Sequence, residues 1–161
     1  MKTKPLLATL VVVMGLAQPA LADSSGVWGC QARLVVRPTH VEATVIRVWN
    51  FSDRRDVLLE EINIFGNDGV QLPLGPRAPV LPVQIGPHQQ TALIVQNLLD
   101  VPLPLPPTFT MFGIQVIVKW RTNSGGEPLA EVSWNVSHRD PVTPELMTLV
   151  STDTRKCYDL K

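Results

Sequence analysis

The chain has 161 residues, a formal net charge of +0, 45% hydrophobic residues and 17% charged residues. This length suits one domain with a substantial core, and the hydrophobic fraction excludes an intrinsically disordered chain. The balanced charge excludes a nucleic-acid binder that works by neutralising phosphates. The 15 prolines disfavour long helices, so the composition favours short elements and loops.

The N-terminus has the pattern of a secretory signal peptide. Lys2 and Lys4 form a positive n-region, an apolar stretch follows over residues 6–16, and Ala20 and Ala22 occupy the small-residue positions of a cleavage site. The apolar stretch is short for a membrane span. We therefore predict a cleaved signal peptide that ends at Ala22 and export of the remaining chain to the periplasm or beyond the cell.

The mature chain, residues 23–161, is predicted to form one domain without a membrane span. It carries 12 basic and 14 acidic residues, a net charge of −2. Its two cysteines, Cys30 and Cys157, predict a structural disulfide, because an even pair in an oxidising compartment is usually oxidised and no Cys-x-x-Cys motif is present. Closing so long a loop would contribute roughly 4–5 kcal/mol in the chain-entropy model.

Short β-branched runs separated by turn residues fill the mature chain. Gly66-Asn67-Asp68-Gly69 predicts a hairpin turn, since glycine adopts positive φ freely. Residues 122–126 predict a second turn, from which the chain returns as the partner of the preceding strand. No segment has helical periodicity. The predicted strands are residues 34–37, 41–51, 57–65, 70–72, 91–96, 110–121 and 129–138.

Alternation of apolar and polar residues is clearest in the last two predicted strands. Ile114, Val116 and Val118 share one face of the first, and Val132 and Val136 are in step on the second. Such alternation is typical of half-buried strands in an antiparallel sheet. Seven or eight short strands predict a single immunoglobulin-like β-sandwich with proline-rich crossovers. The tryptophans predicted to pack in its core or on its sheet faces are Trp28, Trp49, Trp120 and Trp134.

Five short motifs lie in order between Ala43 and Asp140. They are Val45-Ile46-Arg47-Val48-Trp49-Asn50-Phe51-Ser52, Ile62-Asn63-Ile64-Phe65-Gly66-Asn67-Asp68-Gly69, Ile85-Gly86-Pro87, Val116-Ile117-Val118-Lys119-Trp120 and Glu127-Pro128-Leu129-Ala130-Glu131. In order and spacing this stretch resembles a family of small secreted bacterial immunoglobulin-like β-sandwich domains of uncharacterised function. The resemblance implies an exported sandwich and supplies no catalytic residues. The proline-rich stretches and the terminal cysteines depart from the family's pattern.

Prolines are concentrated between Pro73 and Pro107, where 35 residues contain nine prolines and only two charges. Two interpretations stay open: rigid crossovers that blunt a sheet edge, or a stiff segment that displays Leu103 and Leu105 to a protein partner. The segment predicted to bind this partner is Pro102, Leu103, Pro104, Leu105, Pro106 and Pro107. Four earlier prolines recur every third residue, which would stack their rings on one face of a polyproline II helix: Pro73, Pro76, Pro79 and Pro82.

The sequence contains no assembled catalytic pattern and implies no cofactor. It has no Gly-x-Ser-x-Gly motif, and the adjacent residues of His138-Arg139-Asp140 or Glu60-Glu61 would point to opposite faces of a strand. Candidate ligands for copper or zinc are scattered along the chain without close spacing, so no metal site is assigned. They are His40, His88, His138, Met111 and Met147.

These features predict a non-catalytic exported β-sandwich that binds another protein, for example as an accessory subunit of an envelope complex. Its partner is a protein and not a nucleic acid. The alternative hypothesis is a small periplasmic protein that binds copper or zinc through some of its histidines.

Overall fold

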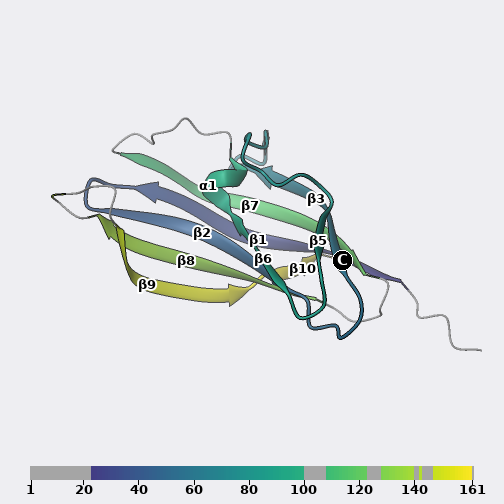
Figure 1. The fold of residues 1–161 in the computed structure, drawn as a ribbon. Helices are drawn as coiled ribbons and strands as arrows, with labels where there is room; N and C mark the ends of the chain where they lie inside the picture. The colour runs from purple at the N-terminus through teal and green to yellow at the C-terminus, as the bar shows by residue number, and fades with distance from the viewer. Residues whose placement is uncertain (1–22, 100–107, 123–127, 140–141, 143–146, 161) are drawn as a thin grey trace, which may run out of the picture.

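The computed structural model describes residues 23–99, 108–122, 128–139, 142 and 147–160 (Figure 1). Three predictions lie outside the described residues: the signal peptide over residues 1–22, the protein-binding segment from Pro102 to Pro107 with its Leu103 and Leu105, and the turn over residues 122–126 beyond Thr122.

The described residues form ten strands and one short helix. In chain order these are β1 (Ser24–Val36), β2 (His40–Trp49), β3 (Val57–Phe65), β4 (Gln71–Leu72), β5 (Val83–Ile85), β6 (Gln90–Ile94), α1 (Val95–Leu98), β7 (Phe109–Thr122), β8 (Leu129–Arg139), β9 (Met147–Lys156) and β10 (Tyr158–Leu160). All strand pairs are antiparallel. The prediction of an all-β antiparallel fold is confirmed.

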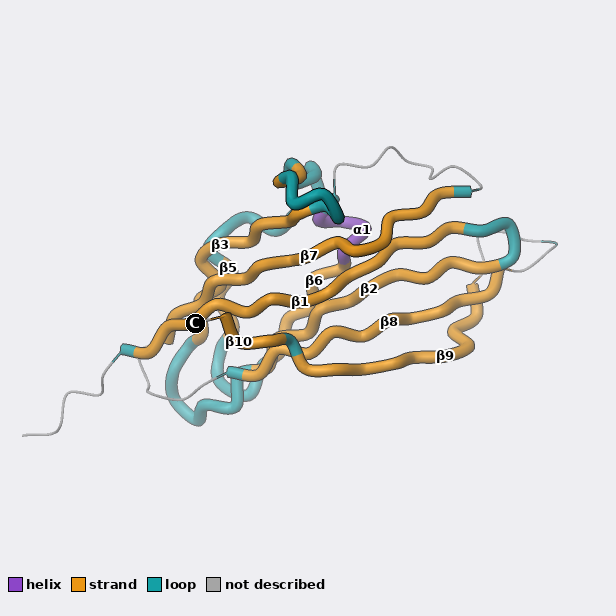
Figure 2. Tube along the Cα trace, turned by 180° about the vertical axis from the view of Figure 1, so that it is seen from behind, coloured by secondary structure: helices purple, strands orange, loops and turns teal. Residues whose placement is uncertain are grey.

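The strands belong to one sheet, in the order β4-β3-β7-β1-β2-β8-β9 (Figure 2). Three short strands extend this path, because β5 pairs with β3, β6 pairs with β2 and β10 pairs with β1. Hydrogen bonding therefore connects all ten strands as a single sheet. The finer prediction, two sheets packed as an immunoglobulin-like sandwich, stays a prediction.

The sheet divides between β1 and β2. Residues 34–36 of β1 pair with residues 41–43 of β2. Beyond this short contact the two strands part. Residues 27–29 of β1 then pair with β10, and residues 45–49 of β2 pair with β6. Where β1 and β2 part, each therefore forms backbone hydrogen bonds with another strand. Buried residues of β1, β2, β3, β7 and β8 nevertheless pack in one hydrophobic core.

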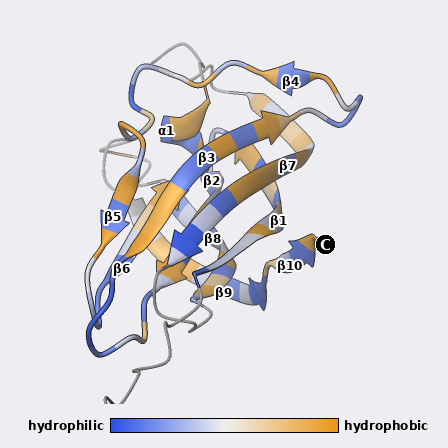
Figure 3. Ribbon diagram, turned by 90° about the vertical axis from the view of Figure 1, so that its right-hand side faces the viewer, coloured by the Kyte–Doolittle hydropathy of each residue, from blue (hydrophilic) through white to orange (hydrophobic). Residues whose placement is uncertain are grey.

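The predicted alternation along β7 is confirmed by its burial. Ile114, Val116, Val118 and Trp120 are buried and lie in the core together with apolar residues of β3. In Figure 3, hydrophobic and hydrophilic colours alternate along β3 and β7. Trp120 stacks on Trp28 of β1 with ring centroids 5.3 Å apart. Trp49 and Trp134 are half-buried. All four tryptophans therefore lie in the core or on the sheet, as predicted.

The predicted pairing of the strands at 110–121 and 129–138 is wrong. β7 lies between β3 and β1, whereas β8 lies between β2 and β9. Alternation is a property of one strand and its buried face, and it carries no information about which neighbour takes each edge. The other predicted hairpin is confirmed: β3 pairs with β4, Gly66 N–H donates to the Val70 carbonyl at 2.9 Å, and Gly69 has φ +77°.

Several elements differ from the predicted bounds. β1 starts ten residues earlier than the predicted strand at 34–37. The run at 91–96 ends as the four-residue helix α1. β9 and β10 were not expected, because their residues are mostly polar and do not alternate. A strand at the edge of a sheet needs no buried face, and for that reason it lacks the pattern by which strands are recognised.

The proline-rich stretch before β5 is not one polyproline II helix. Ala78 N–H donates to the Gly75 carbonyl at 3.0 Å, which is a turn, and polyproline II has no internal hydrogen bonds. Leu74 forms an isolated bridge with Leu99, and Gly75 N–H donates to the Leu98 carbonyl at 2.8 Å. This stretch is therefore tied to the segment after α1, which favours the interpretation of a rigid crossover for this part of the chain.

The predicted disulfide is present and lies within one chain. Cys30 of β1 is bonded to Cys157, the residue between β9 and β10, across a sequence separation of 127. Cys30 is fully buried, and Cys157 N–H donates to the Ala130 carbonyl of β8. The bond fastens the C-terminal strands to the core of the sheet.

Candidate functional site

The outermost strand of the sheet, β9, has an open edge. Nine of its ten residues pair with β8, and no strand pairs with its other edge in the part of the chain that the structure describes. Figures 1 and 2 both show it at the rim of the sheet. Residues 148–156 are all exposed. An open edge of this length presents a row of backbone donors and acceptors to a further strand.

The first half of β9 has neither charge nor proline, two of the features that usually protect an edge. Residues 148–152 include no charge and no proline, and Leu149 and Val150 expose 59% and 55% of their surface. A bulge at this point leaves Val150 without a counterpart on β8, since Ser151 faces Val136 and Leu149 faces Ser137. Charges are confined to the second half, at Asp153, Arg155 and Lys156.

A strip of charged and aromatic side chains crosses the sheet from β1 to β9. Arg33 Nε lies 3.1 Å from Glu42 Oε2, and the Arg33 guanidinium lies 5.4 Å from the ring centroid of Trp134. On the β9 side, the Arg155 guanidinium lies 4.8 Å from the same ring, and Arg155 Nη2 lies 3.3 Å from Asp153 Oδ2. Each arginine thus has a carboxylate partner and a contact with the indole ring, which holds the Trp134 side chain in place.

The three histidines do not converge on one point. His40 and His138 face each other across β2 and β8 with ring centroids 6.5 Å apart, and His40 Nε2 lies 3.7 Å from Glu42 Oε1. His88 instead lies in the turn between β5 and β6, where its Nε2 is 3.0 Å from Asp53 Oδ1. Within the described residues, no group of three His, Cys, Asp or Glu side chains is placed to hold a metal ion.

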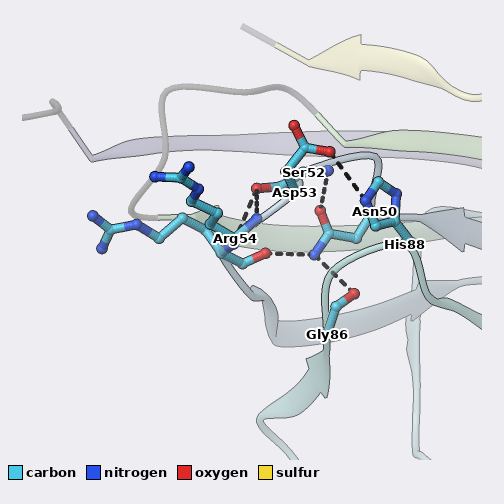
Figure 4. A network of polar contacts seen from close by, with 7 residues as sticks. Asn50, Ser52, Asp53, Arg54, Gly86 and His88 are labelled. Carbon is cyan, nitrogen blue, oxygen red and sulfur yellow. Dashed lines mark hydrogen bonds and ion pairs between the residues drawn. The ribbon is translucent and has the colours of Figure 1, made fainter.

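A buried amide organises the loops beside His88 (Figure 4). Asn50 is 3% exposed, and its Nδ2 lies 2.7, 2.9 and 3.0 Å from the carbonyl oxygens of Arg55, Ile85 and Gly86. Its Oδ1 accepts a hydrogen bond from the backbone N–H of Ser52. The network joins the segment after β2 to the segment after β5. All its partners are backbone groups, so the Asn50 side chain holds the two segments together.

Two clefts of similar size lie on the described surface. The first, of about 530 Å³, is lined by residues at the start of β1, by Trp120 and by the chain around the disulfide. There the Trp120 ring lies directly on Gly26, where a Cβ would come within 2.7 Å of a ring carbon. The second, of about 480 Å³, lies beside Trp134 and is lined by Gln31, Arg33, Phe112 and Gln115, among others.

Most of the predicted site residues are not brought together. The disulfide pair is joined, whereas His88 is separate from His40 and His138, and Asp140 lies in the undescribed part. Of the two methionines, Met111 faces Leu34 and Met147 faces Arg139 in the strand register. The open edge of β9 and the cleft beside Trp134 were missed. The sequence does contain a signal for each site. Leu149 and Val150 are apolar residues in an otherwise polar stretch, at the edge strand, and Gly113 is a glycine within a strand, at the cleft.

Comparisons with known proteins assign no family. No known protein family and no curated protein sequence matches the chain. A crystal structure of Thermotoga maritima 1070 is similar with a TM-score of 0.41 and 15% sequence identity over 83% of this chain and 92% of that chain. This similarity is too weak to support an argument about fold or function. No helix among the described residues is long and apolar enough to cross a membrane.

Proposed function

We propose that this chain is an exported, non-catalytic protein-binding module with an immunoglobulin-like β-sandwich fold, and that it receives an extended segment of a partner protein along β9. The observation that carries the proposal is the ten-residue strand whose outer edge has no strand neighbour in the described part of the chain. Adding a strand to such an edge lets main-chain hydrogen bonds supply affinity while neighbouring side chains select the partner.

The side chains of β9 divide this docking edge into two parts. Leu149 and Val150 offer exposed apolar surface, and Asp153, Arg155 and Lys156 follow within a few residues. A partner strand with apolar residues at one end and both signs of charge at the other would complement this order. The apolar end provides burial, and the charged end sets direction and register.

Export is supported by the signal-peptide pattern and by the disulfide between Cys30 and Cys157, since structural disulfides persist in oxidising compartments. An exported chain meets its partners in the periplasm or outside the cell. The proposed role is therefore that of an accessory subunit of an envelope complex.

Photocrosslinking in intact cells tests the proposal. A benzophenone amino acid at position 149 should yield an adduct of one defined mass, and mass spectrometry should map the crosslink to an extended segment of another protein. The matched control places the same residue at position 80, because Val80 is 91% exposed and lies between β4 and β5, which both pair with β3, far from β9 in the strand order. An adduct of twice the chain mass would instead identify a second copy as the occupant and overturn the proposal of a different protein.

Proline substitutions test whether the edge itself makes the bonds. Along an antiparallel strand, alternate residues bond to each neighbour, so one of Thr152 and Asp153 presents its N–H outward. Of T152P and D153P, the variant that keeps the melting temperature marks the outward position, and it should lose the adduct at position 149. An unchanged adduct in that variant would contradict strand addition.

Copper or zinc binding, the alternative function, has one supporting observation, the His40 and His138 rings that face each other across β2 and β8. Two imidazoles provide half of the ligands of a tetrahedral site. Zinc titration of the purified protein, followed by calorimetry and compared with the H138A variant, tests it. Equal weak binding to both proteins would exclude a site at this pair.

A further inference from the structure

The cleft beside Trp134 has the composition of a ligand site that does not depend on β9 as a docking edge. It measures about 480 Å³, within the range of small-molecule sites. Four elements contribute its walls: β1, the turn between β3 and β4, β7 and β8. Side chains that line it are Gln31, Arg33, Asn67, Phe112, Gln115 and Trp134.

A β-bulge in β7 shapes this cleft. Ala32 faces Ile114 and Leu34 faces Met111, so Phe112 and Gly113 together oppose Arg33. Gly113 has φ +66°, and a Cβ at this position would come within 2.5 Å of Asn67 Oδ1. Bulges redirect side chains and are frequent beside binding sites. Here the β3–β4 turn lies against β7 at the bulge, and Phe112 is 57% exposed, whereas the even-numbered residues of β7 beyond the bulge, from Ile114 to Thr122, are buried.

Three primary amides line the cleft without partners. The side chains of Gln31, Asn67 and Gln115 are exposed and make no side-chain hydrogen bond to any described residue. Each amide offers two donors and one acceptor. A ligand that presents groups able both to donate and to accept, such as hydroxyls, would match all three.

The charged groups at the cleft are already neutralised. Arg33 is paired with Glu42 at 3.1 Å, and Arg155, which also contacts the Trp134 ring, is paired with Asp153 at 3.3 Å. An anionic ligand would have to compete with these carboxylates. The site therefore favours a neutral ligand over a phosphate or a carboxylate.

Phe112 adds a free aromatic surface. The face of its ring carries partial negative charge, so it attracts the partly positive C–H bonds on one face of a pyranose ring. Trp134 is fixed by the two arginine side chains and forms a rigid wall. From these three properties (unpartnered amides, neutralised charge and an exposed aromatic ring) we propose that this cleft binds a neutral saccharide of one or two pyranose units.

Saturation-transfer NMR with cellobiose and N,N′-diacetylchitobiose tests the proposal on the purified mature protein. We expect transfer from protein to the ring C–H protons of at least one disaccharide. The F112A variant should weaken binding about tenfold or more, as the loss of one stacking contact does. Q115A should also weaken binding, because it removes one amide.

The matched control is F51A, which removes an equally exposed phenylalanine from the loop after β2. This variant should bind within about twofold of the unmodified protein, well below the tenfold step expected at the cleft. Equal affinity of F112A and F51A would overturn the proposal, as would displacement of the sugar by sodium sulfate or the absence of transfer to both disaccharides. None of these outcomes bears on crosslinking at β9, so the two proposals fail separately.

Discussion

β7 and β9 are both long strands of the same sheet, and their surroundings are opposite. β7 lies between β3 and β1 and buries Ile114, Val116, Val118 and Trp120 on one face. Among the described strands, β9 has a single neighbour, and it exposes each of residues 148–156. A strand with two neighbours forms backbone hydrogen bonds on both edges and stabilises the fold through its buried side chains. A strand with one neighbour keeps the backbone donors and acceptors of its outer edge available for binding.

The comparison divides the molecule into a stable centre and a rim that is free to interact. Substitutions at the centre should therefore lower the free energy of unfolding strongly, and substitutions at the rim should leave it almost unchanged. The disulfide connects the two regions, since Cys30 lies in β1 and Cys157 directly follows β9.

The largest effect is expected from removing this connection. The double variant C30S/C157S should lose roughly 4–5 kcal/mol of unfolding free energy, because the bond closes a loop of more than a hundred residues in the unfolded chain. Urea denaturation followed by tryptophan fluorescence measures it. Reduction of the unmodified protein should reproduce the loss, and a change below about 1 kcal/mol in both experiments would show that the rim is held without the bond.

The contrast between β7 and β9 is tested by truncating one aliphatic side chain of similar size to alanine in each strand. I114A in β7 should cost about 2–5 kcal/mol, because Ile114 is 1% exposed and its removal leaves a cavity. L149A in β9 should change the stability by no more than about 0.5 kcal/mol. Chemical denaturation under one set of conditions gives both values. Similar losses for the two variants would mean that β9 is buried in solution, and the proposed docking edge would then be occupied.

A smaller loss of unfolding free energy is expected when the buried amide of Asn50 is removed, and almost none when an exposed amide is removed. N50A should cost about 1–3 kcal/mol, because it leaves the carbonyl oxygens that Asn50 Nδ2 contacts without their donor. N63A removes an amide that makes two side-chain hydrogen bonds but lies on the exposed face of β3, so a change within about 0.5 kcal/mol is expected. Thermal unfolding compares them, and equal losses would contradict a pinning role for Asn50.

Much of the fold could be predicted from residue patterns. The strand at 57–65 has the predicted bounds, and the turn of Gly66-Asn67-Asp68-Gly69 joins β3 to β4 as predicted. The Cys30–Cys157 pair could be predicted because two cysteines leave only one pairing within the chain. These features depend on local backbone preference, on alternation of burial or on simple counting.

The candidate sites could not be predicted in the same way. The cleft combines Gln31 of β1, Asn67 of a turn and Gln115 of β7, and no spacing in the sequence relates these residues. Their proximity follows from the strand order, in which β7 pairs with β1 and β3 and not with the strand that follows it.

The sequence by itself determined the class of the fold, most strand positions, one hairpin and the cysteine pair, because each follows from local chemistry or from one strand's own alternation. Only the tertiary structure decided which strand became the rim. β9 has no apolar periodicity. It lies at the edge because it pairs with β8 on one side and no other described strand pairs with it. Which strands become neighbours in a sheet depends on packing between residues that are far apart in the sequence. The residue pattern along the chain does not specify these neighbours.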